Sequence, residues 1–313
     1  MRVGDSSRNL PLSGSFRVDH TTGPRFTKVA APAVAQGGSS LTVNTTFTNG
    51  ATESVDNAVS TLSVPPGWTA TAKSPSTFST VGAGQSVSTT WSVAVPAGAK
   101  GGAVTLQGAT RYRGSAKTSP SDGSATVQVA FANLAAAYNV VGVTDDANPT
   151  PGNLDGAGYS LSAQKLASVG VTPGGTVTSG STTFTWPDAA VGQPDAVTTA
   201  GQIVSLSGSG SALSFLAVGT NGTQTGPVTV TYTDGTTSTS TLTVADWFSN
   251  TAVPGCTLAV TAPGWNTPPN STYPHTQKVS LYAASVPLTA GRQLAYVTLP
   301  NVGGLHIFAD TVG

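Results

Sequence analysis

Charged residues are scarce in this sequence. Only 8% of its 313 residues are Asp, Glu, Lys or Arg, against roughly 25% in an ordinary soluble protein. The 13 basic and 13 acidic residues cancel, so the chain has no basic surface field for a phosphate backbone, and we expect no nucleic-acid partner. No hydrophobic run approaches the 18 or so residues that span a bilayer, so we expect no membrane-spanning segment.

Cysteine and glutamate each occur once. Cys256 has no partner for an intrachain disulfide and is interpreted as a small buried hydrophobe. Glu53 is the only glutamate, whereas glycosidases generally place two carboxylates across the bond that they cleave. Asp145 and Asp146 are adjacent, and neighbours on a strand point to opposite faces. No nucleophile elbow or nucleotide-binding loop occurs. The sequence therefore predicts no catalytic residues, and an enzyme of unrecognised type is the alternative.

The abundant residues are those of β-structure and turns. The chain has 37 glycines and 21 prolines, and Thr, Val and Ser far outnumber the helix formers Glu, Lys and Leu. Such a composition can also indicate disorder. The 38% of hydrophobic residues and their alternation with polar ones argue against that. We predict an all-β protein, with an Ig-like β-sandwich followed by a larger jelly-roll β-sandwich.

Residues 1–23 are predicted to be the trailing strand of a preceding domain. The run VGDSSRNLPLSGSF at residues 3–16 resembles the end of the fibronectin-like domain of family 3 β-glucosidases. A single strand after a Ser-rich turn is the plain alternative. The resemblance implies an upstream catalytic domain in the same polypeptide. Met1 is not followed by the apolar run of a signal peptide, so we expect any secretion signal to lie further upstream.

Residues 24–131 are predicted to form the Ig-like spacer domain. Short alternating runs separated by turns suit a sandwich of about 100 residues. The runs SVPPGW at 63–68 and TWSV at 90–93 resemble the Ig-like domain associated with bacterial α-galactosidases. This implies a spacer role, with Trp68 and Trp91 in the core rather than on a sugar-binding surface. The expected strands are Ser40–Asn49, Val55–Val64, Ser86–Val95, Ala103–Tyr112 and Ser124–Phe131.

A linker at 132–137 is predicted to lead into a jelly-roll domain at 138–313. The runs NVVGVTDD at 139–146 and FTWP at 184–187 are similar to a C-terminal module of actinobacterial secreted glycosidases, which resembles galactose-binding-like modules. One helical turn is expected at Ser162–Ser168, and 138–143 is expected to be a strand. The other expected strands are Thr176–Thr178, Thr182–Trp186, Ile203–Leu206, Ala212–Val218, Gly226–Tyr232, Ser238–Val244, Thr257–Ala262, Lys278–Val286, Gln293–Leu299 and Leu305–Ala309.

The best candidate for carbohydrate binding is a turn-rich segment at 262–277. Sugars stack on aromatic rings while amides and imidazoles bind their hydroxyls. The alternatives are that Trp265 closes one end of the sandwich and that His275 bonds a loop carbonyl. Trp186, Phe184, Phe215, Trp247 and Tyr282 lie in apolar runs and are expected in the core. The carbohydrate-binding residues predicted here are Trp265, Asn266, Asn270, Tyr273 and His275.

A second cluster, at 145–155, is rich in side-chain oxygens. Calcium takes six to eight oxygen ligands, and a loop of this kind can supply several. The spacing is not that of an EF-hand, and Asx turns are the alternative. The residues predicted to hold a structural calcium ion are Asp145, Asp146, Asn148, Asn153 and Asp155.

These observations predict a non-catalytic accessory region of a secreted glycoside hydrolase. Its partners would be a carbohydrate and the catalytic domain of the same polypeptide. The Thr-rich, Lys-poor composition resembles that of secreted proteins from high-GC Gram-positive bacteria, so we expect an extracellular location. The alternative is a structural spacer, at the cell surface or between domains, that binds no sugar.

Overall fold

A computed structural model describes residues 25–114, 118–272 and 275–313. The trailing strand predicted at 1–23 lies outside these residues. Two compact units are present. One contains residues 40–95 and 104–127 with the strand before them, and the other contains 128–313 with the short segments 34–39 and 96–103. In the described parts of the chain, no helix is long and apolar enough to cross a membrane.

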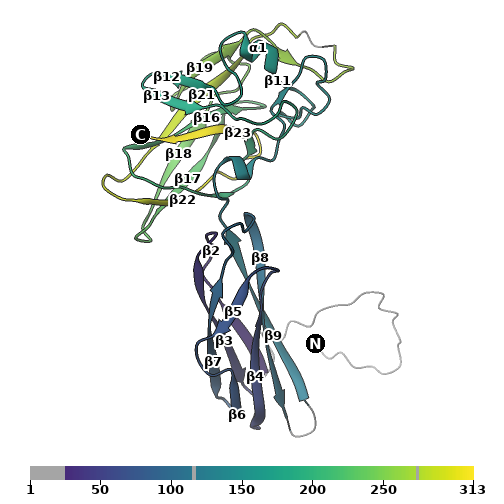
Figure 1. The fold of residues 1–313 in the computed structure, drawn as a ribbon, viewed down its shortest axis with the longest axis vertical. Helices are drawn as coiled ribbons and strands as arrows, with labels where there is room; N and C mark the ends of the chain where they lie inside the picture. Colours follow the sequence, from purple (N-terminus) through teal and green to yellow (C-terminus); the bar gives the residue numbers. More distant parts are fainter. Residues whose placement is uncertain (1–24, 115–117, 273–274) are drawn as a thin grey trace. The chain divides into compact units, whose positions relative to one another are not determined.

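Two β-sheets make up the N-terminal sandwich, and the strand pairings that the structure describes there are antiparallel except for that of β2 with β9 (Figure 1). One has the strand order β1-β3-β7-β5 and the other β2-β9-β8-β4-β6. These nine strands are β1 (Arg25–Ala30), β2 (Val34–Ala35), β3 (Ser40–Asn49), β4 (Val55–Ser63), β5 (Thr69–Ala72), β6 (Thr77–Val81), β7 (Ser86–Ala94), β8 (Gly102–Arg113) and β9 (Thr118–Val129).

The core of this sandwich combines apolar packing with buried hydroxyls. Phe47 and Tyr112 pack with ring centroids 5.1 Å apart. Thr45 is buried, and its Oγ1 lies 2.8 Å from Ser60 Oγ and accepts a hydrogen bond of 2.9 Å from Trp91 Nε1. Trp68 and Trp91 are both buried, as the sequence predicted. Thr27 Oγ1 likewise donates to Thr110 Oγ1 at 3.0 Å. Buried hydroxyls of this kind are hydrogen-bonded within the sandwich, which explains how so polar a sequence forms a core.

The C-terminal unit contains two large sheets and two small ones. The large sheets have the orders β14-β23-β16-β21-β19 and β15-β22-β17-β18, and the small ones β10-β11-β20 and β12-β13. Their strands are β10 (Val143–Thr144), β11 (Ser160–Ser162), β12 (Thr176–Ser179), β13 (Thr182–Thr185), β14 (Val197–Thr198), β15 (Ile203–Ser205), β16 (Ala212–Gly219), β17 (Gln224–Tyr232), β18 (Thr237–Val244), β19 (Cys256–Ala262), β20 (Trp265–Asn266), β21 (Val279–Pro287), β22 (Leu294–Thr298) and β23 (Leu305–Val312).

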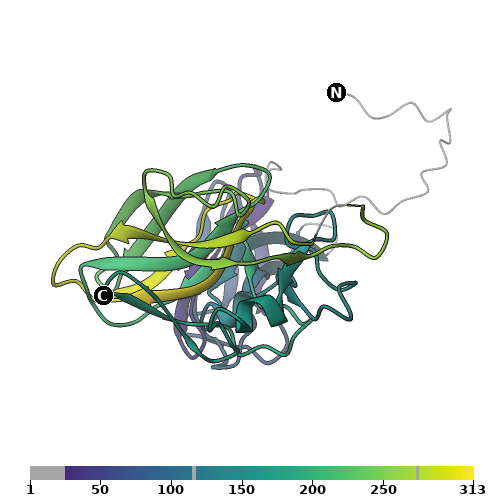
Figure 2. The ribbon, with the colours of Figure 1, turned by 90° about the horizontal axis from the view of Figure 1, so that it is seen from above.

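The five-stranded sheet of this unit is covered on both faces. Phe215 on β16 belongs to the core shared with the four-stranded sheet. Its neighbour Leu216 belongs to a second core, formed with Phe184, Trp186, Trp247 and Trp265. Loops, the small sheets and the helix supply that second core, and the helix lies along one side of the green and yellow strands (Figures 1 and 2). The expected core positions Phe184, Trp186, Phe215, Trp247 and Tyr282 are all buried.

The predicted helical turn is present as α1 (Ala163–Ala167). Ser162 is its N-cap, and the Ser162 hydroxyl accepts a hydrogen bond from Lys165 N–H at 3.1 Å. The strand predicted at 138–143 is not formed, since only Val143–Thr144 pairs as a strand and Val140 makes one isolated bridge to Ala196. Leu134 and Ala137, within the predicted linker, are buried in the core of this unit.

Candidate functional site

An aromatic cluster surrounds Trp265. The Tyr159 ring stacks on the Trp265 ring, with centroids 4.5 Å apart and 16° between the planes. Phe248 and Trp247 meet Trp265 edge-on at 4.5 and 5.5 Å. Trp265 is therefore only 4% exposed. This corrects the expectation of an open Trp265 platform, because three other rings already cover it.

The cluster reaches solvent at a shallow recess, which we call the aromatic hollow. It is lined by Tyr159, Phe248, Trp265 and Gln277 and has a volume of about 320 Å³. Tyr159 and Phe248 are partly exposed, and Gln277 is exposed. The hollow thus combines ring surfaces with one amide, which is the combination that stacks on a sugar ring and binds a hydroxyl.

The other residues predicted to bind carbohydrate are not gathered in one place. Asn266 is buried, and its Nδ2 donates hydrogen bonds of 3.0 Å to Thr144 O and Thr144 Oγ1, so its amide is used within the protein. Asn270 and His275 are exposed, and His275 Nδ1 lies 3.1 Å from Thr267 Oγ1. Tyr273 lies outside the described residues. A sugar-binding role for these side chains stays a prediction, and the burial of Asn266 removes the basis on which it was included.

The first two predicted calcium ligands contact the helix that follows them. Asp145 Oδ2 accepts a hydrogen bond from Gln164 Nε2 at 2.7 Å. Asp146 accepts one from the Ser162 hydroxyl and forms an ion pair of 3.1 Å with Lys165. Partial burial raises the pKa of Asp146, but these hydrogen bonds outweigh it and lower the pKa below its usual value. Both carboxylates therefore fix the start of α1.

The remaining predicted ligands belong to a separate turn. Asp155 Oδ1 accepts hydrogen bonds from the N–H groups of Ala157 and Tyr159, at 2.9 and 3.2 Å, and Asn153 Oδ1 accepts one from Gly158. Asn148 bridges only to Asp145 through its backbone. Among the described residues, no group of three or more His, Cys, Asp or Glu side chains is placed to hold a metal ion. These contacts match the Asx-turn alternative, and the calcium ion stays a prediction.

A second recess, which sequence reasoning missed, lies beside that turn. We call it the polar groove, and its volume is about 500 Å³. It brings together residues from distant segments, so no local pattern could reveal it. Most of its polar side chains carry amides or hydroxyls. The polar side chains that line it are Asn139, Asn153, Asp155, Thr198, Thr220, Asn221, Gln224 and His306.

One carboxylate joins the loops beside the two recesses. Asp246 Oδ1 accepts a hydrogen bond of 2.8 Å from the N–H of Phe248, which lines the aromatic hollow. Asp246 Oδ2 accepts one of 2.6 Å from the N–H of Gly222, next to Asn221 of the polar groove. The sequence gives no signal for this residue beyond its place after a strand.

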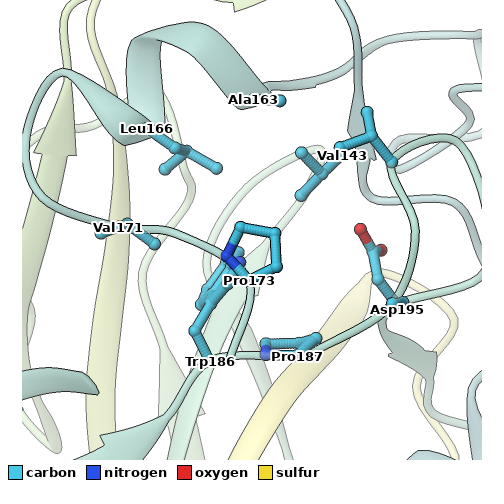
Figure 3. A pocket seen from close by; sticks show the side chains of 10 residues that line it. Val143, Ala163, Leu166, Val171, Pro173, Trp186, Pro187 and Asp195 are labelled. Atoms are coloured by element: carbon cyan, nitrogen blue, oxygen red, sulfur yellow. The ribbon is translucent and has the colours of Figure 1, made fainter. Parts of the chain in front are cut away.

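A third cavity is small and contains a buried acid (Figure 3). Its volume of about 30 Å³ equals the share of one water molecule in the liquid. Figure 3 shows the carboxyl of Asp195 pointing toward Val143, among apolar neighbours such as Pro187. Burial raises the pKa of Asp195 to about 7, although hydrogen bonds from the N–H groups of Gly142 and Val143 lower it. A cavity of this size has no room for a sugar ring.

Two family models match the chain. Residues 35–113 match the NPCBM-associated, NEW3 domain of alpha-galactosidase, which makes this part a glycosidase-associated accessory domain. Residues 128–313 match the AziU2-like beta-sandwich domain. A comparison with curated proteins finds no match.

Similar solved structures share little sequence with the chain. The GAE domain of GGA2p from Saccharomyces cerevisiae is 14% identical, with 33% of this chain and 88% of that one covered and a TM-score of 0.26. The secreted serine protease VesC from Vibrio cholerae is 10% identical, with 90% and 49% covered and a TM-score of 0.27. The C-terminal domain of AspA from Streptococcus pyogenes is 8% identical, with 92% of each chain covered and a TM-score of 0.26.

Scores this low carry no argument about function. The family models are informative because the match at 35–113 covers most of the N-terminal sandwich and the match at 128–313 covers the second one. The match at 128–313 includes the aromatic hollow, the polar groove and the cavity at Asp195. Through this match, which extends over more than half of its length, the chain belongs to the AziU2-like β-sandwich domain family.

Proposed function

We propose that the chain is the carbohydrate-binding accessory region of a secreted glycoside hydrolase. The observation that carries this proposal is the match of residues 35–113 to a domain associated with α-galactosidase. The resemblance of residues 3–16 to family 3 β-glucosidases supports an upstream catalytic domain of that type. The resemblance of residues 139–146 and 184–187 to a module of actinobacterial glycosidases supports an actinobacterial source. In this arrangement the first sandwich is a spacer and the second binds the sugar.

The aromatic hollow is the surface that we assign to the sugar. A pyranose presents C–H groups on one face, which pack on the exposed parts of the Tyr159 and Phe248 rings. Gln277 would then accept from or donate to a hydroxyl at the rim. Binding of this kind holds the attached enzyme near its polysaccharide and raises its effective concentration there.

Three of the described carboxylates support a non-catalytic role. Glu53 is exposed in the N-terminal sandwich. Asp195 borders a cavity with room for about one water molecule, and Asp155 is engaged in an Asx turn. A glycosidase needs an acid and a second carboxylate on opposite sides of one bond. The polysaccharide contact that we propose needs neither.

Affinity electrophoresis of the whole chain in gels that contain neutral polysaccharides tests this proposal. We expect retardation by at least one polysaccharide, and less retardation for Phe248→Ala and Gln277→Ala. Tyr296→Ala is the matched control, because Tyr296 is a partly exposed aromatic residue of the same unit that does not line the hollow. If no polysaccharide retards the chain, the alternative of a structural spacer is favoured. Turnover of aryl glycosides by the purified chain would contradict the non-catalytic part of the proposal.

A further inference from the structure

The polar groove presents several polar atoms that the protein leaves unused. Asn221 Nδ2 donates to the Asp155 carbonyl at 3.3 Å, and Gln224 Nε2 donates to Thr220 O at 2.7 Å. Within the residues that the structure describes, no hydrogen-bond partner is found for Asp155 Oδ2, Asn221 Oδ1, Gln224 Oε1 or Asn153 Nδ2. Each side chain is thus held by one of its polar atoms and has another available to a ligand.

His306 forms one wall of the groove, and hydrogen bonds hold its ring in place. His306 is 3% exposed, and its Nδ1 and Nε2 each lie 3.0 Å from a hydroxyl, of Thr198 and of Thr220 respectively. The Thr220 hydroxyl also donates to Gly304 O, at 3.3 Å, so it accepts from Nε2–H. Nδ1 is then the acceptor and Thr198 the donor. Burial lowers the pKa of the His306 ring to about 4, so the ring is neutral near pH 7. The two hydroxyls fix its orientation, so this wall is preorganised and carries no charge.

Glycines shape the floor next to that wall. A Cβ at Gly304 would lie 2.7 Å from Gln224 Nε2 and 2.9 Å from Thr220 O, so only glycine lets Gln224 reach its place. Asn221 itself has φ of 58°, a left-handed conformation that asparagine tolerates better than most residues. Gly304 and Asn221 thus allow the backbone to place the amides of Gln224 and Asn221 in the groove.

The charge and shape of the groove select among ligand classes. No lysine or arginine lines it, which disfavours phosphates and carboxylates. Asp155 is its single carboxylate, too few for a calcium site, which gathers several anionic or carbonyl oxygens. Its volume of about 500 Å³ falls in the range of small-molecule sites, roughly 300–1,000 Å³. Amide and carboxylate acceptors together with an amide donor suit a molecule covered in hydroxyls.

We propose that the polar groove, lined by Asn153, Asp155, Asn221, Gln224 and His306, is a second binding site of this unit, for a neutral polyhydroxylated molecule of one or two sugar rings. It would bind through hydrogen bonds alone and does not use the aromatic hollow. The inference shares only its ligand class with the proposed function. A carbohydrate could therefore occupy the groove even if the hollow binds none.

Amide chemical-shift mapping on the whole ¹⁵N-labelled chain tests this site. Glucose, galactose, mannose and arabinose are titrated separately, and calcium chloride is titrated alone. The reporters for the groove are the amides of Gly156, Asn221 and Gly304, and that of Gln277 reports on the hollow. We expect saturable shifts at the groove amides with at least one sugar.

Two variants remove ligand contacts at the groove. Asp155→Asn keeps the acceptor for the N–H groups of Ala157 and Tyr159. Gln224→Leu keeps most of the side-chain volume but also loses the hydrogen bond from Gln224 Nε2 to Thr220 O. Each is expected to weaken sugar binding at the groove amides at least tenfold, whereas Phe248→Ala in the hollow leaves it unchanged.

The outcomes separate this inference from the proposed function. Sugar-dependent shifts at the Gln277 amide alone would overturn the second site and leave the proposed function standing. Shifts at the groove amides with calcium but with no sugar would also overturn it. Sugar-dependent shifts at the groove amides alone would support the second site and contradict the assignment of the hollow. Unchanged binding in both Asp155→Asn and Gln224→Leu would show that the side chains named here are not the contacts.

Discussion

Asp195 and His306 are both buried in the second unit, and burial moves each toward its neutral form. It raises the pKa of the Asp195 carboxyl to about 7 and lowers the pKa of the His306 ring to about 4. The two groups therefore act on stability in opposite senses. Between about pH 4 and 7 the native chain holds a proton on Asp195 that the unfolded chain has lost, so this contribution falls as the pH rises. For His306, stability rises with pH from about 4 to 6.5, because the unfolded chain binds the additional proton.

Asp195→Asn separates these two contributions. The amide can still accept from Gly142 N–H, which bonds Asp195 Oδ1 at 2.7 Å, but it does not ionise. We expect the variant to gain stability relative to the native protein as the pH rises from about 4 to about 8, by on the order of 4 kcal/mol at about 1.4 kcal/mol per pKa unit. Urea unfolding at both pH values measures this. A difference that does not change with pH would show that Asp195 ionises as it would in water.

The Ser162 hydroxyl both caps α1 and contacts Asp146. Ser162→Ala should lower the free energy of unfolding by about 1–2 kcal/mol, the usual cost of losing such a cap. Ser168→Ala is the control, because Ser168 is exposed at the other end of the helix, and a change within about 0.5 kcal/mol is expected. Equal effects in chemical denaturation would contradict the role assigned to the cap.

Side-chain contacts at 145–155 give an expectation for calcium. Asp145, Asp146 and Asp155 already accept hydrogen bonds from the protein, as turn-forming residues do. The Asx-turn alternative therefore predicts that EDTA leaves the melting temperature unchanged in differential scanning calorimetry. A lower melting temperature in EDTA that calcium restores would instead favour the calcium site.

At the scale of elements, β16 has an unusual position. Seven of its eight residues are buried, so both faces of the strand contact a core. Its sequence ALSFLAVG has nearly continuous hydrophobicity rather than alternation, which is typical of a strand covered on both faces. The loops and small sheets that cover the second face thus form a hydrophobic core with it, and they are part of the folded unit rather than a surface addition.

Substitutions on the two faces of β16 test this directly. Phe215→Ala is expected to cost about 3–5 kcal/mol, and Leu216→Ala about 2–5 kcal/mol, since each leaves a cavity in a different core. Thr239→Ala, at an exposed position of β18, should change stability by less than about 0.5 kcal/mol. Guanidinium unfolding checks all three, and a cost below about 1 kcal/mol for Leu216→Ala would contradict a second core.

Most of the long strands were predictable, and several of the short elements were not. The alternation at Ser40–Asn49 gave β3 with the same limits, and the capped run gave α1. β10, β11 and β20 were missed because each has only two or three residues, and their partners are distant. Leu161 pairs with Val143 and with Trp265. These partners are too far away in sequence for a local pattern to reveal the pairing. The expected strand at 138–143 failed for the related reason that Val140 bridges to a loop residue, Ala196.

The same limit applies to the candidate sites. Trp265 and its loop stood out by composition, but the rings that cover Trp265 come from Tyr159 and Phe248, far away in sequence. The polar groove depends on tertiary structure still more. Its residues Asp155, Asn221 and His306 lie far apart in the sequence, and none of them belongs to a recognisable motif. Sequence reasoning identified the residue types that carry chemistry and could not identify their neighbours.

For the whole molecule, two β-sandwiches with one match to a glycosidase-associated domain support an accessory role. The scarcity of charge fits this arrangement. Hydroxyls and amides satisfy one another in the first sandwich, and they line the polar groove in the second. Such a surface has little long-range attraction for charged partners and suits neutral, hydroxyl-rich ones.

The central claim is that the second unit binds a neutral carbohydrate at the aromatic hollow. Isothermal titration calorimetry of the whole chain, with an oligosaccharide from the polysaccharide that retards it, measures this most directly. We predict saturable binding whose Kd rises at least about tenfold, or about 1.4 kcal/mol, in Phe248→Ala and stays unchanged in Tyr296→Ala. Binding that is equally strong in Phe248→Ala and Gln277→Ala, or no binding to any neutral oligosaccharide, would contradict the claim.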